Sequence, residues 1–538
     1  MKFNTYKSLA VAFVSMLSVG CTNLEPNTDF QVTQEKYYAE QRKSILEDPT
    51  KLSALSLPAY SSLFQFMGER NIYALTEGST DEMMTPTRGN DWSDNGLWLQ
   101  LHKQEWGADH LIVENGWNDM SVGISRTFNT LKDIYDIGDG DEYFLEIAQP
   151  YLAEVRFLRA YYVWQVLDLF GQVPYRNEDG VNVALDRVTA TNLVIQELEE
   201  ITPLLFEKKD QPEYGKVVRE TGHALLSKVY LNRFIYNGES SASKEDMDKA
   251  IEHADAVLNS PSYRLADDYF QLFDFNNQDS PEALLIIRNG YNVSSEFSGQ
   301  TRALMTLHYS QTGGTAALQP WNGMCTTEEF FNSWDQDGIN GNGVETTDYR
   351  FQDTRYLQST GLNLGLLEGQ QYSTSGVQLK DRNGNLLAYT AEIADISNAQ
   401  EFEGVRVLKW APDQLSENFW RANNDVALLR FADVYLMKAE ALWRNGDAAG
   451  ALTIINDLRL RRGNTVLSSI GVDGQEILDE RGFELYWEGY RRTDLVRFGQ
   501  FTKGTWAGKD VTTEDRNIYP IPSSVLVSSD GFSQNSGY

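Results

Sequence analysis

The sequence predicts a mainly α-helical fold, built as a scaffold of helix pairs that carries long irregular loops. Apolar residues recur every three or four positions over several segments, which is the period of an amphipathic helix. Two stretches, 76–106 and 262–424, break this rhythm and are rich in Gly, Asp, Asn, Ser or Trp. Irregular stretches of this length inside a compact domain usually carry function. We therefore expect one helical domain over residues 36–538, with ligand-binding loops at about 76–106 and 262–424.

The helices are predicted from their apolar spacing and their end signals. Residues 150–170 place Leu152, Val155 and Leu169 on one face, with Pro150 suited to the first turn and Gly171 suited to the end. Three further segments have the same helical period: 190–206, 219–237 and 244–259.

The clearest helix pair covers residues 425–462. Its two helices are joined by a turn at Gly446 and Asp447, and small residues such as Ala439 and Ala451 lie near that turn. Small residues permit close helix packing, as in tetratricopeptide repeats. The pairs do not recur at a fixed period, so a regular solenoid is not indicated. A last strong helix is predicted over 475–498.

Composition excludes several classes of protein. The 538 residues are 41% hydrophobic and 12% aromatic, enough for a sizeable core and unlike a disordered chain. Asp and Glu number 77 against 46 Lys and Arg, a formal charge of -31. Such an acidic surface repels phosphate backbones, so we expect no nucleic-acid partner. Two cysteines form neither a disulfide framework nor a structural zinc site.

The first 21 residues resemble a bacterial lipoprotein signal. Lys2 and Lys7 give a positive start, residues 9–17 form a short apolar segment, and small residues precede Cys21. We expect a signal peptide at 1–20, lipidation of Cys21 and a polar tether over 21–35. Several acyl chains together would anchor the chain stably. The alternative is an ordinary secretory signal in which Cys21 occurs by chance.

Five segments, in order, carry a resemblance to the SusD/RagB family of outer-membrane nutrient-binding lipoproteins. The resemblance covers nearly the whole chain, because the lipoprotein signal at the other end agrees with it. The segments are EVRFLRAYY at 154–162 followed by LFGQVP at 169–174, RFADVYLMKAEA at 430–441, the charged set between Glu480 and Arg497, YPIP at 519–522 and QNSGY at 534–538.

The resemblance implies a tetratricopeptide-like fold and a lipid-anchored protein on the outer membrane that faces the exterior. It implies capture of an oligosaccharide or polysaccharide and its delivery to a SusC-like TonB-dependent transporter. It also implies a binding protein and not an enzyme. Two alternatives are a protein-interaction scaffold and a peptide-capturing lid of the transporter. A remote third is a glycoside hydrolase, which needs only two carboxylates.

Most charged residues in these segments also have a purely structural interpretation. Charges at intervals of three or four residues on helices usually form ion pairs along or between helices. We predict such pairing for six of them: Arg156, Arg159, Glu484, Glu488, Arg491 and Asp494.

The 76–106 stretch contains the residue types that bind sugars. A sugar presents apolar C–H faces and hydroxyls, so its site needs flat aromatic rings and convergent polar side chains. In the family, a stretch at this place supplies part of the glycan site. The candidate glycan-binding residues are Asp81, Arg88, Asp91, Trp92, Asn95 and Trp98. The alternative is that Trp98 and Trp106 pack the loop onto the scaffold, which we favour for Trp106.

A second aromatic cluster lies in the central region. Trp321 follows Pro320 and precedes Asn322 and Gly323, a turn signal that predicts a loop tip. The family places the rest of its glycan platform in this region, so Tyr309, Trp321 and Asn322 are candidates. The alternative for Trp321 is core packing under a long loop. Cys325 is predicted to be a small buried hydrophobe.

No cofactor or metal is expected. In residues 335–345 oxygen ligands alternate with glycines, as in calcium loops, but Ile339 occupies the fifth position, where an EF-hand has a ligand. A plain Gly/Asn turn is the preferred interpretation over a calcium site. The chain has no G-x-S-x-G, H-E-x-x-H or P-loop motif.

Overall fold

The computed structural model describes residues 33–177, 180–211, 213–290, 300–311, 319–334, 347–413 and 422–538. Residues 1–20, Cys21 and the segment 335–345 lie outside these ranges, so the predictions made for them stay predictions. Of the predicted tether, Gln34 and Glu35 already belong to the first helix. Within the described ranges, no helix combines the length and the apolar character that crossing a bilayer requires.

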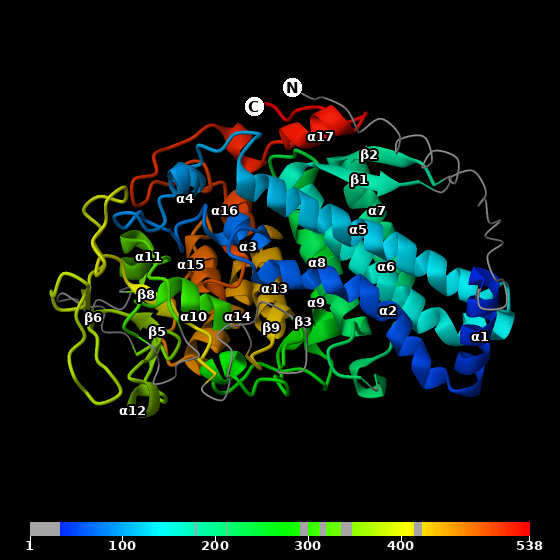
Figure 1. Ribbon diagram of the computed structural model, residues 1–538, viewed down its shortest axis with the longest axis horizontal. Helices are drawn as coiled ribbons and strands as arrows, with labels where there is room; N and C mark the ends of the chain where they lie inside the picture. The colour runs from blue at the N-terminus through cyan, green and yellow to red at the C-terminus, as the bar shows by residue number, and fades with distance from the viewer. Residues whose placement is uncertain are drawn as a thin grey trace, which may run out of the picture.

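A row of long helices forms the body of the molecule (Figure 1). Each packs on the next in chain order from α5 to α9, and α9 then packs on α13, which pairs with α14. This arrangement confirms the predicted scaffold of helix pairs. The helices are α5 (Leu111–Gly138), α6 (Glu142–Phe170), α7 (Arg187–Ile201), α8 (Arg219–Tyr236), α9 (Lys244–Leu258), α13 (Phe431–Arg444) and α14 (Ala448–Arg461).

Helix α6 is the central helix of this body. The Asp141 side chain caps its start by accepting a hydrogen bond from the backbone N–H of Phe144, and Gly171, at φ 73°, ends it. The helix begins eight residues before the predicted start at Pro150, which lies inside it. Phe144 and Ala148 are fully buried. Their burial offsets the hydrogen bond that Pro150 removes.

Two predicted helices differ from the structure. Val426–Arg430, predicted as the start of a helix, is strand β9, which pairs antiparallel with β3 (Ala283–Ile287). The predicted helix 475–498 is two helices, α15 (Gln475–Leu485) and α16 (Arg491–Arg497). Trp487 and Gly489 lie between them at φ 61° and 90°, a backbone conformation that no helix continues.

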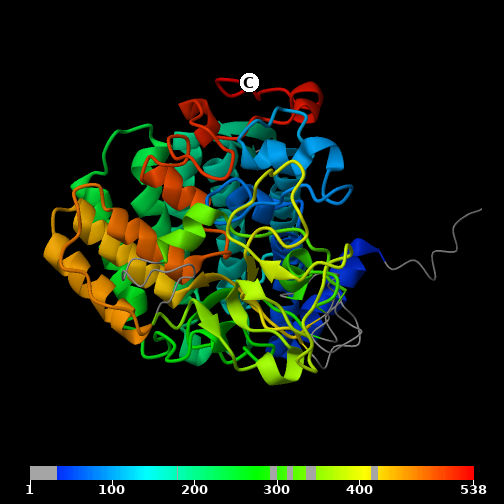
Figure 2. The same ribbon diagram turned by 90° about the vertical axis from the view of Figure 1, so that its left-hand side faces the viewer.

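The remaining elements frame the body and form its loop-rich end, which faces the viewer in Figure 2. The helices are α1 (Gln34–Glu47), α2 (Leu52–Tyr60), α3 (Ile72–Glu77), α4 (Leu97–His102), α10 (Gln300–Thr306), α11 (Glu328–Ser333), α12 (Leu357–Thr360) and α17 (Ser523–Ser528). The strands are β1 (Gln172–Arg176) with β2 (Asn182–Asp186), β4 (Gln352–Asp353) with β5 (Leu364–Leu367) and β8 (Arg406–Leu408), and β6 (Gly369–Gln370) with β7 (Ala388–Tyr389).

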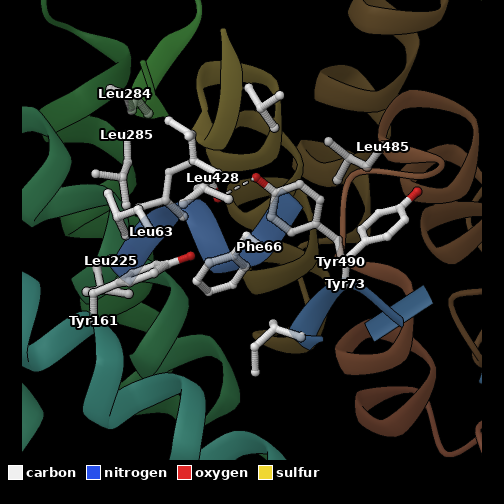
Figure 3. Close-up of a cluster of buried hydrophobic side chains, with 14 of the residues drawn as sticks. Leu63, Phe66, Tyr73, Tyr161, Leu225, Leu284, Leu285, Leu428, Leu485 and Tyr490 are labelled. Carbon is white, nitrogen blue, oxygen red and sulfur yellow. Dashed lines mark hydrogen bonds between the residues drawn. The ribbon is translucent and has the colours of Figure 1, made fainter. Parts of the chain in front are cut away.

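The hydrophobic core joins the helical body to the loop-rich end. Figure 3 shows Phe66, which precedes α3, and Tyr73, which lies in α3, packed among residues from the body and from the C-terminal region. The Tyr490 hydroxyl donates a hydrogen bond of 2.9 Å to the carbonyl of Leu428 within this cluster. The segment around α3, which leads into the 76–106 loop, is therefore anchored in the core before the loop begins.

The charged residues of the signature segments form ion pairs, as predicted. Arg156 and Arg159 bind Glu197 on α7, so the pairs join neighbouring helices. Arg481 binds Asp494 at 2.7 Å, and both side chains are buried. The remaining pairs are Glu484 with Arg350, Arg430 and Arg462, Glu488 with Lys409 and Arg430, and Arg491 with Asp81.

Candidate functional site

The loop after α3 enters the loop-rich end through two short contacts. The backbone of Met84 pairs antiparallel with that of Cys325, and Arg88 pairs with Asp91 across a tight turn. Trp92 then has a φ of 60°, a conformation that a bulky residue rarely adopts. Such strain is tolerated where the surroundings hold it in place, and it clusters at binding sites.

Three tryptophans from two distant segments form an aromatic cluster: Trp92, Trp98 and Trp321. The Trp92 ring lies 5.4 Å from that of Trp98, edge to face, and 6.3 Å from that of Trp321. The indole N–H of Trp92 donates to the Trp321 carbonyl at 2.9 Å. Trp98 is 2% exposed and donates to Asp94, so it is a buried support for the Trp92 ring. Trp92 and Trp321 are only partly buried, which leaves part of each indole ring open to a ligand.

Close backbone packing lets these rings meet. A Cβ at Gly323 would overlap the Trp92 ring and come within 2.9 Å of the Met305 carbonyl. Only glycine fits there, because any larger residue would displace the indole.

A polar network lies beside the aromatic cluster and consists of Asp91, His308, Tyr309, Arg382 and Glu401. The Tyr309 hydroxyl donates to Asp91 at 2.6 Å, and the Arg382 guanidinium donates to the same carboxylate at 2.7 Å. Arg382 also binds Glu401 through its backbone N–H and through its Nε. Its guanidinium lies 4.7 Å above the Tyr309 ring, a cation–π contact. One arginine thus fixes two carboxylates and a tyrosine.

The protonation states in this network are fixed by burial and hydrogen bonding. Burial lowers the pKa of His308, so its ring is neutral at pH 7 and its Nε2–H donates to Glu401 at 2.9 Å. Burial alone would raise the pKa of Glu401, but hydrogen bonds from His308 and Arg382 keep it below its usual value. Burial raises the pKa of Tyr309, which stays a neutral donor. The Arg382 side chain is 57% exposed, so the network is open to a ligand.

Two predicted site residues lie behind this surface. Arg88 is 2% exposed; its guanidinium donates to the Gln400 carbonyl and lies 3.8 Å from the Cys325 sulfur. Asn322 is fully buried and accepts a 2.8 Å hydrogen bond from Arg406. Neither side chain faces solvent, so both position the loops that carry the aromatic rings. Cys325 is buried, as predicted.

Two other predicted site residues, Asp81 and Asn95, lie outside the aromatic cluster. Both carboxylate oxygens of Asp81 accept hydrogen bonds from Arg491, at 2.7 and 2.6 Å. This bidentate pair ties the start of the loop to α16. Asn95 is exposed at φ 55°, in the turn that leads to α4. Trp106 packs into the core, as favoured, and donates to Tyr538 at 2.7 Å.

Besides His308, the chain neighbour of the predicted Tyr309, the structure adds two residues to the candidate site that the sequence did not single out, Arg382 and Glu401. Both lie in the 262–424 region, about 300 positions from Asp91 along the chain. Nothing in their local sequence distinguishes them from ordinary loop charges. Within the described residues, no group of three or more His, Cys, Asp or Glu side chains is placed to hold a metal ion.

Comparison with known proteins finds similar proteins in one family. A family model described as "SusD family" matches residues 281–538. The starch-binding protein SusD of Bacteroides thetaiotaomicron is 28% identical over 409 residues, covering 72% of each chain. Residues 281–538 thus resemble the SusD family, and the chain as a whole is similar to starch-binding SusD over 72% of its length.

Solved structures of the SusD superfamily share the fold. One from Parabacteroides distasonis superposes with a TM-score of 0.70 at 20% identity, covering 91% of this chain and 99% of that one. The surface glycan-binding protein A of B. thetaiotaomicron, solved in complex with laminarihexaose, superposes with a TM-score of 0.67 at 17% identity, covering 90% and 99%. These likenesses confirm the predicted SusD-like fold.

Proposed function

We propose that this protein captures an oligosaccharide or polysaccharide at the aromatic cluster and the polar network. The observation that carries the proposal is the joining of partly exposed Trp92 and Trp321 to carboxylates fixed by Arg382. Indole rings stack on the apolar faces of sugars, and carboxylates held by an arginine accept hydroxyl hydrogen bonds without reorganising. Starch binding by the 28% identical relative supports the same ligand class.

The site favours capture over hydrolysis. A glycosidase needs one carboxyl with a raised pKa to protonate the leaving oxygen. The pKa of Glu401 is lowered, so this carboxyl is an anion at neutral pH. Its neighbour Asp91 is held by Arg382 and Tyr309. These contacts suit an acceptor of hydrogen bonds and not a proton donor.

The ligand proposed here is a neutral glycan. Asp91 and Glu401 carry two negative charges against the single positive charge of Arg382, and the neutral His308 adds none. A polyanionic glycan would meet this negative balance as well as the charge of -31 on the whole chain. Binding of the neutral glycan should accordingly depend only weakly on salt.

Calorimetric titration with maltoheptaose and laminarihexaose tests the proposal. Trp321→Ala should weaken binding by about 1–3 kcal/mol, by analogy with aromatic stacking on planar ligands. Trp443→Ala is the matched control, because Trp443 is also partly buried but stacks on Phe498 at 5.9 Å and belongs to the helical body. Released reducing ends would be assayed in each mixture. Equal affinity of Trp321→Ala and the unmodified chain would refute the site, and released ends would refute capture without hydrolysis.

The resemblance to the SusD family also supports a place on the outer membrane beside a TonB-dependent transporter. We propose that lipidated Cys21 anchors the chain there, facing the exterior, and that bound glycan passes to a SusC-like partner. Cys21→Ala should move the protein from the membrane to the soluble fraction, and continued membrane fractionation would count against the anchor. Copurification from detergent-solubilised membranes tests the transporter partnership.

A further inference from the structure

A second concave surface lies in the loop-rich end and shares no residue with the candidate site. Asp268, Tyr349, Gln352, Asp353 and Arg355 line a pocket of about 290 Å³. In Figure 1, α12 directly follows these residues and lies at the bottom of the left-hand end, whereas α4, which carries Trp98, lies at its top. These two helices, one next to each surface, are therefore well apart within that end of the molecule.

The pocket presents a flat aromatic ring in a fixed position. Tyr349 is 63% exposed, yet its backbone N–H donates to the Arg462 carbonyl at 2.7 Å. A Cβ at Gly463, where φ is 76°, would lie 2.7–2.8 Å from three atoms of the Tyr349 ring. One face of the ring therefore rests on Gly463, and the glycine is required for this close approach.

A rigid set of polar groups lines the same pocket. The Arg355 guanidinium binds Asp268 through two hydrogen bonds of 2.9 and 2.6 Å, and Asp353 through two of 2.9 and 2.8 Å. The two carboxylates are 44% and 25% exposed, so each keeps lone pairs open to the pocket. Planar, paired groups of this kind match the spacing of neighbouring sugar hydroxyls and need no reorganisation to bind them.

From this geometry we infer a second carbohydrate-binding subsite at the Tyr349 pocket, which takes a neutral oligosaccharide segment. The ring would carry the apolar face of one sugar, and the carboxylates of Asp268 and Asp353 would accept its hydroxyls. Three acids, Asp267, Asp268 and Asp353, line the pocket with three arginines, Arg355, Arg461 and Arg462. Arg462 is buried and paired with Glu282 and Glu484, so the exposed charges of the lining are net negative and disfavour an anionic chain.

The inference rests on the proposed function, and it extends that function to long chains. A polysaccharide that touches both surfaces would gain avidity, because the second contact becomes intramolecular. A short oligosaccharide would occupy one surface at a time and would gain nothing.

The test compares Tyr349→Ala with Tyr349→Phe, which keeps the ring. Both variants and the unmodified chain would be titrated with laminarin and amylopectin as long probes, and with laminarihexaose and maltoheptaose as short ones. Tyr349→Ala should weaken binding of the long polysaccharide about tenfold or more. It should leave unchanged the affinity for whichever short oligosaccharide binds more tightly. Tyr349→Phe should keep most of the affinity for the long polysaccharide. Because the ring is exposed, equal thermal melting of the variants would verify an intact fold.

Adding Trp321→Ala separates the two proposals. Weak long-probe binding that survives Trp321→Ala and disappears in the double variant with Tyr349→Ala would support the second subsite. Long-probe binding that is abolished by Trp321→Ala and unaffected by Tyr349→Ala would overturn the second subsite and leave the proposed function intact. Binding that is unaffected by Trp321→Ala but abolished by Tyr349→Ala would refute the aromatic cluster and support this pocket.

Discussion

Glu484 lies at the centre of a buried ion network, and its replacement by Gln tests what that network contributes. Its carboxylate accepts hydrogen bonds from Arg350 at 3.1 Å, from Arg430 at 2.8 Å and from Arg462 at 2.9 and 3.0 Å. The network contains five cations and five anions, all essentially inaccessible to water. They are Arg350, Arg430, Arg459, Arg462 and Lys409 with Asp348, Glu282, Glu480, Glu484 and Glu488.

Glu484→Gln removes one anion from this balanced set and leaves one buried positive charge uncompensated. The amide N–H₂ of Gln would also face guanidinium donors, so at most one oxygen can still accept. Breaking a buried ion pair in this way costs about 3–5 kcal/mol. We expect a loss of that size in the free energy of unfolding at pH 7, measured by urea denaturation followed through tryptophan fluorescence.

The pH dependence supplies an independent check. Burial alone would raise the pKa of Glu484, but Arg462, Arg430 and Arg350 hold it well below the usual 4.5. A lowered folded-state pKa gives stability that is present above about pH 4.5 and is lost as the pH falls below that value. The difference between Glu484→Gln and the unmodified chain should therefore shrink in acid.

Glu47→Gln is the matched control, because the Lys43–Glu47 pair is exposed and its charged atoms lie 4.0 Å apart. It should change the free energy of unfolding by less than about 0.5 kcal/mol. A loss below about 1 kcal/mol for Glu484→Gln at pH 7, or a loss that grows in acid, would refute the reasoning.

Three further predictions concern the candidate site and Glu77, the buried acid at the end of α3. Gly323→Ala should push the Trp92 ring aside and weaken glycan binding about tenfold in calorimetry; unchanged affinity would show that Trp92 makes no contact. Arg382→Ala should weaken binding about tenfold because the two carboxylates it joins lose their fixed positions, with the melting temperature as control. Burial raises the pKa of Glu77 from 4.5 to about 8, so its contribution to stability is lost as the pH rises from about 4.5 to 8. Glu77→Gln should remove up to a few kcal/mol of that pH dependence in urea denaturation, and an unaltered profile would contradict it.

The sequence predicted helices well where their stability is local. Segments 219–237 and 244–259 became α8 and α9 almost to the residue, because apolar period and end signals act within one helix. Residues 426–430 were assigned wrongly to a helix. Their strand depends on pairing with Ala283–Ile287, more than 130 positions away, and no local signal reports such a partner.

The same distinction applies to the candidate site. Trp92, Trp98 and Trp321 could be picked out because large aromatics among Asp and Asn in a loop are unusual. Which of them is open to a ligand depended on tertiary packing, which buries Trp98 and leaves the other two partly open. Arg382 and Glu401 gave no signal, because their role arises only when their loop folds against Asp91.

The segment that carries the C-terminal family resemblance and the loop that carries Trp92 are parts of one structure. Arg491 binds Asp81 through two hydrogen bonds, the backbone N–H of Trp487 donates to Glu82, and that of Gly489 donates to Glu77. These contacts lie where the loop leaves α3, so they fix its direction before it reaches the aromatic cluster. The C-terminal segment thus fixes the start of the loop whose later residues include Trp92. The family resemblance therefore lies in segments that build the scaffold, whereas the proposed ligand class rests on residues of the loops that this scaffold holds in place.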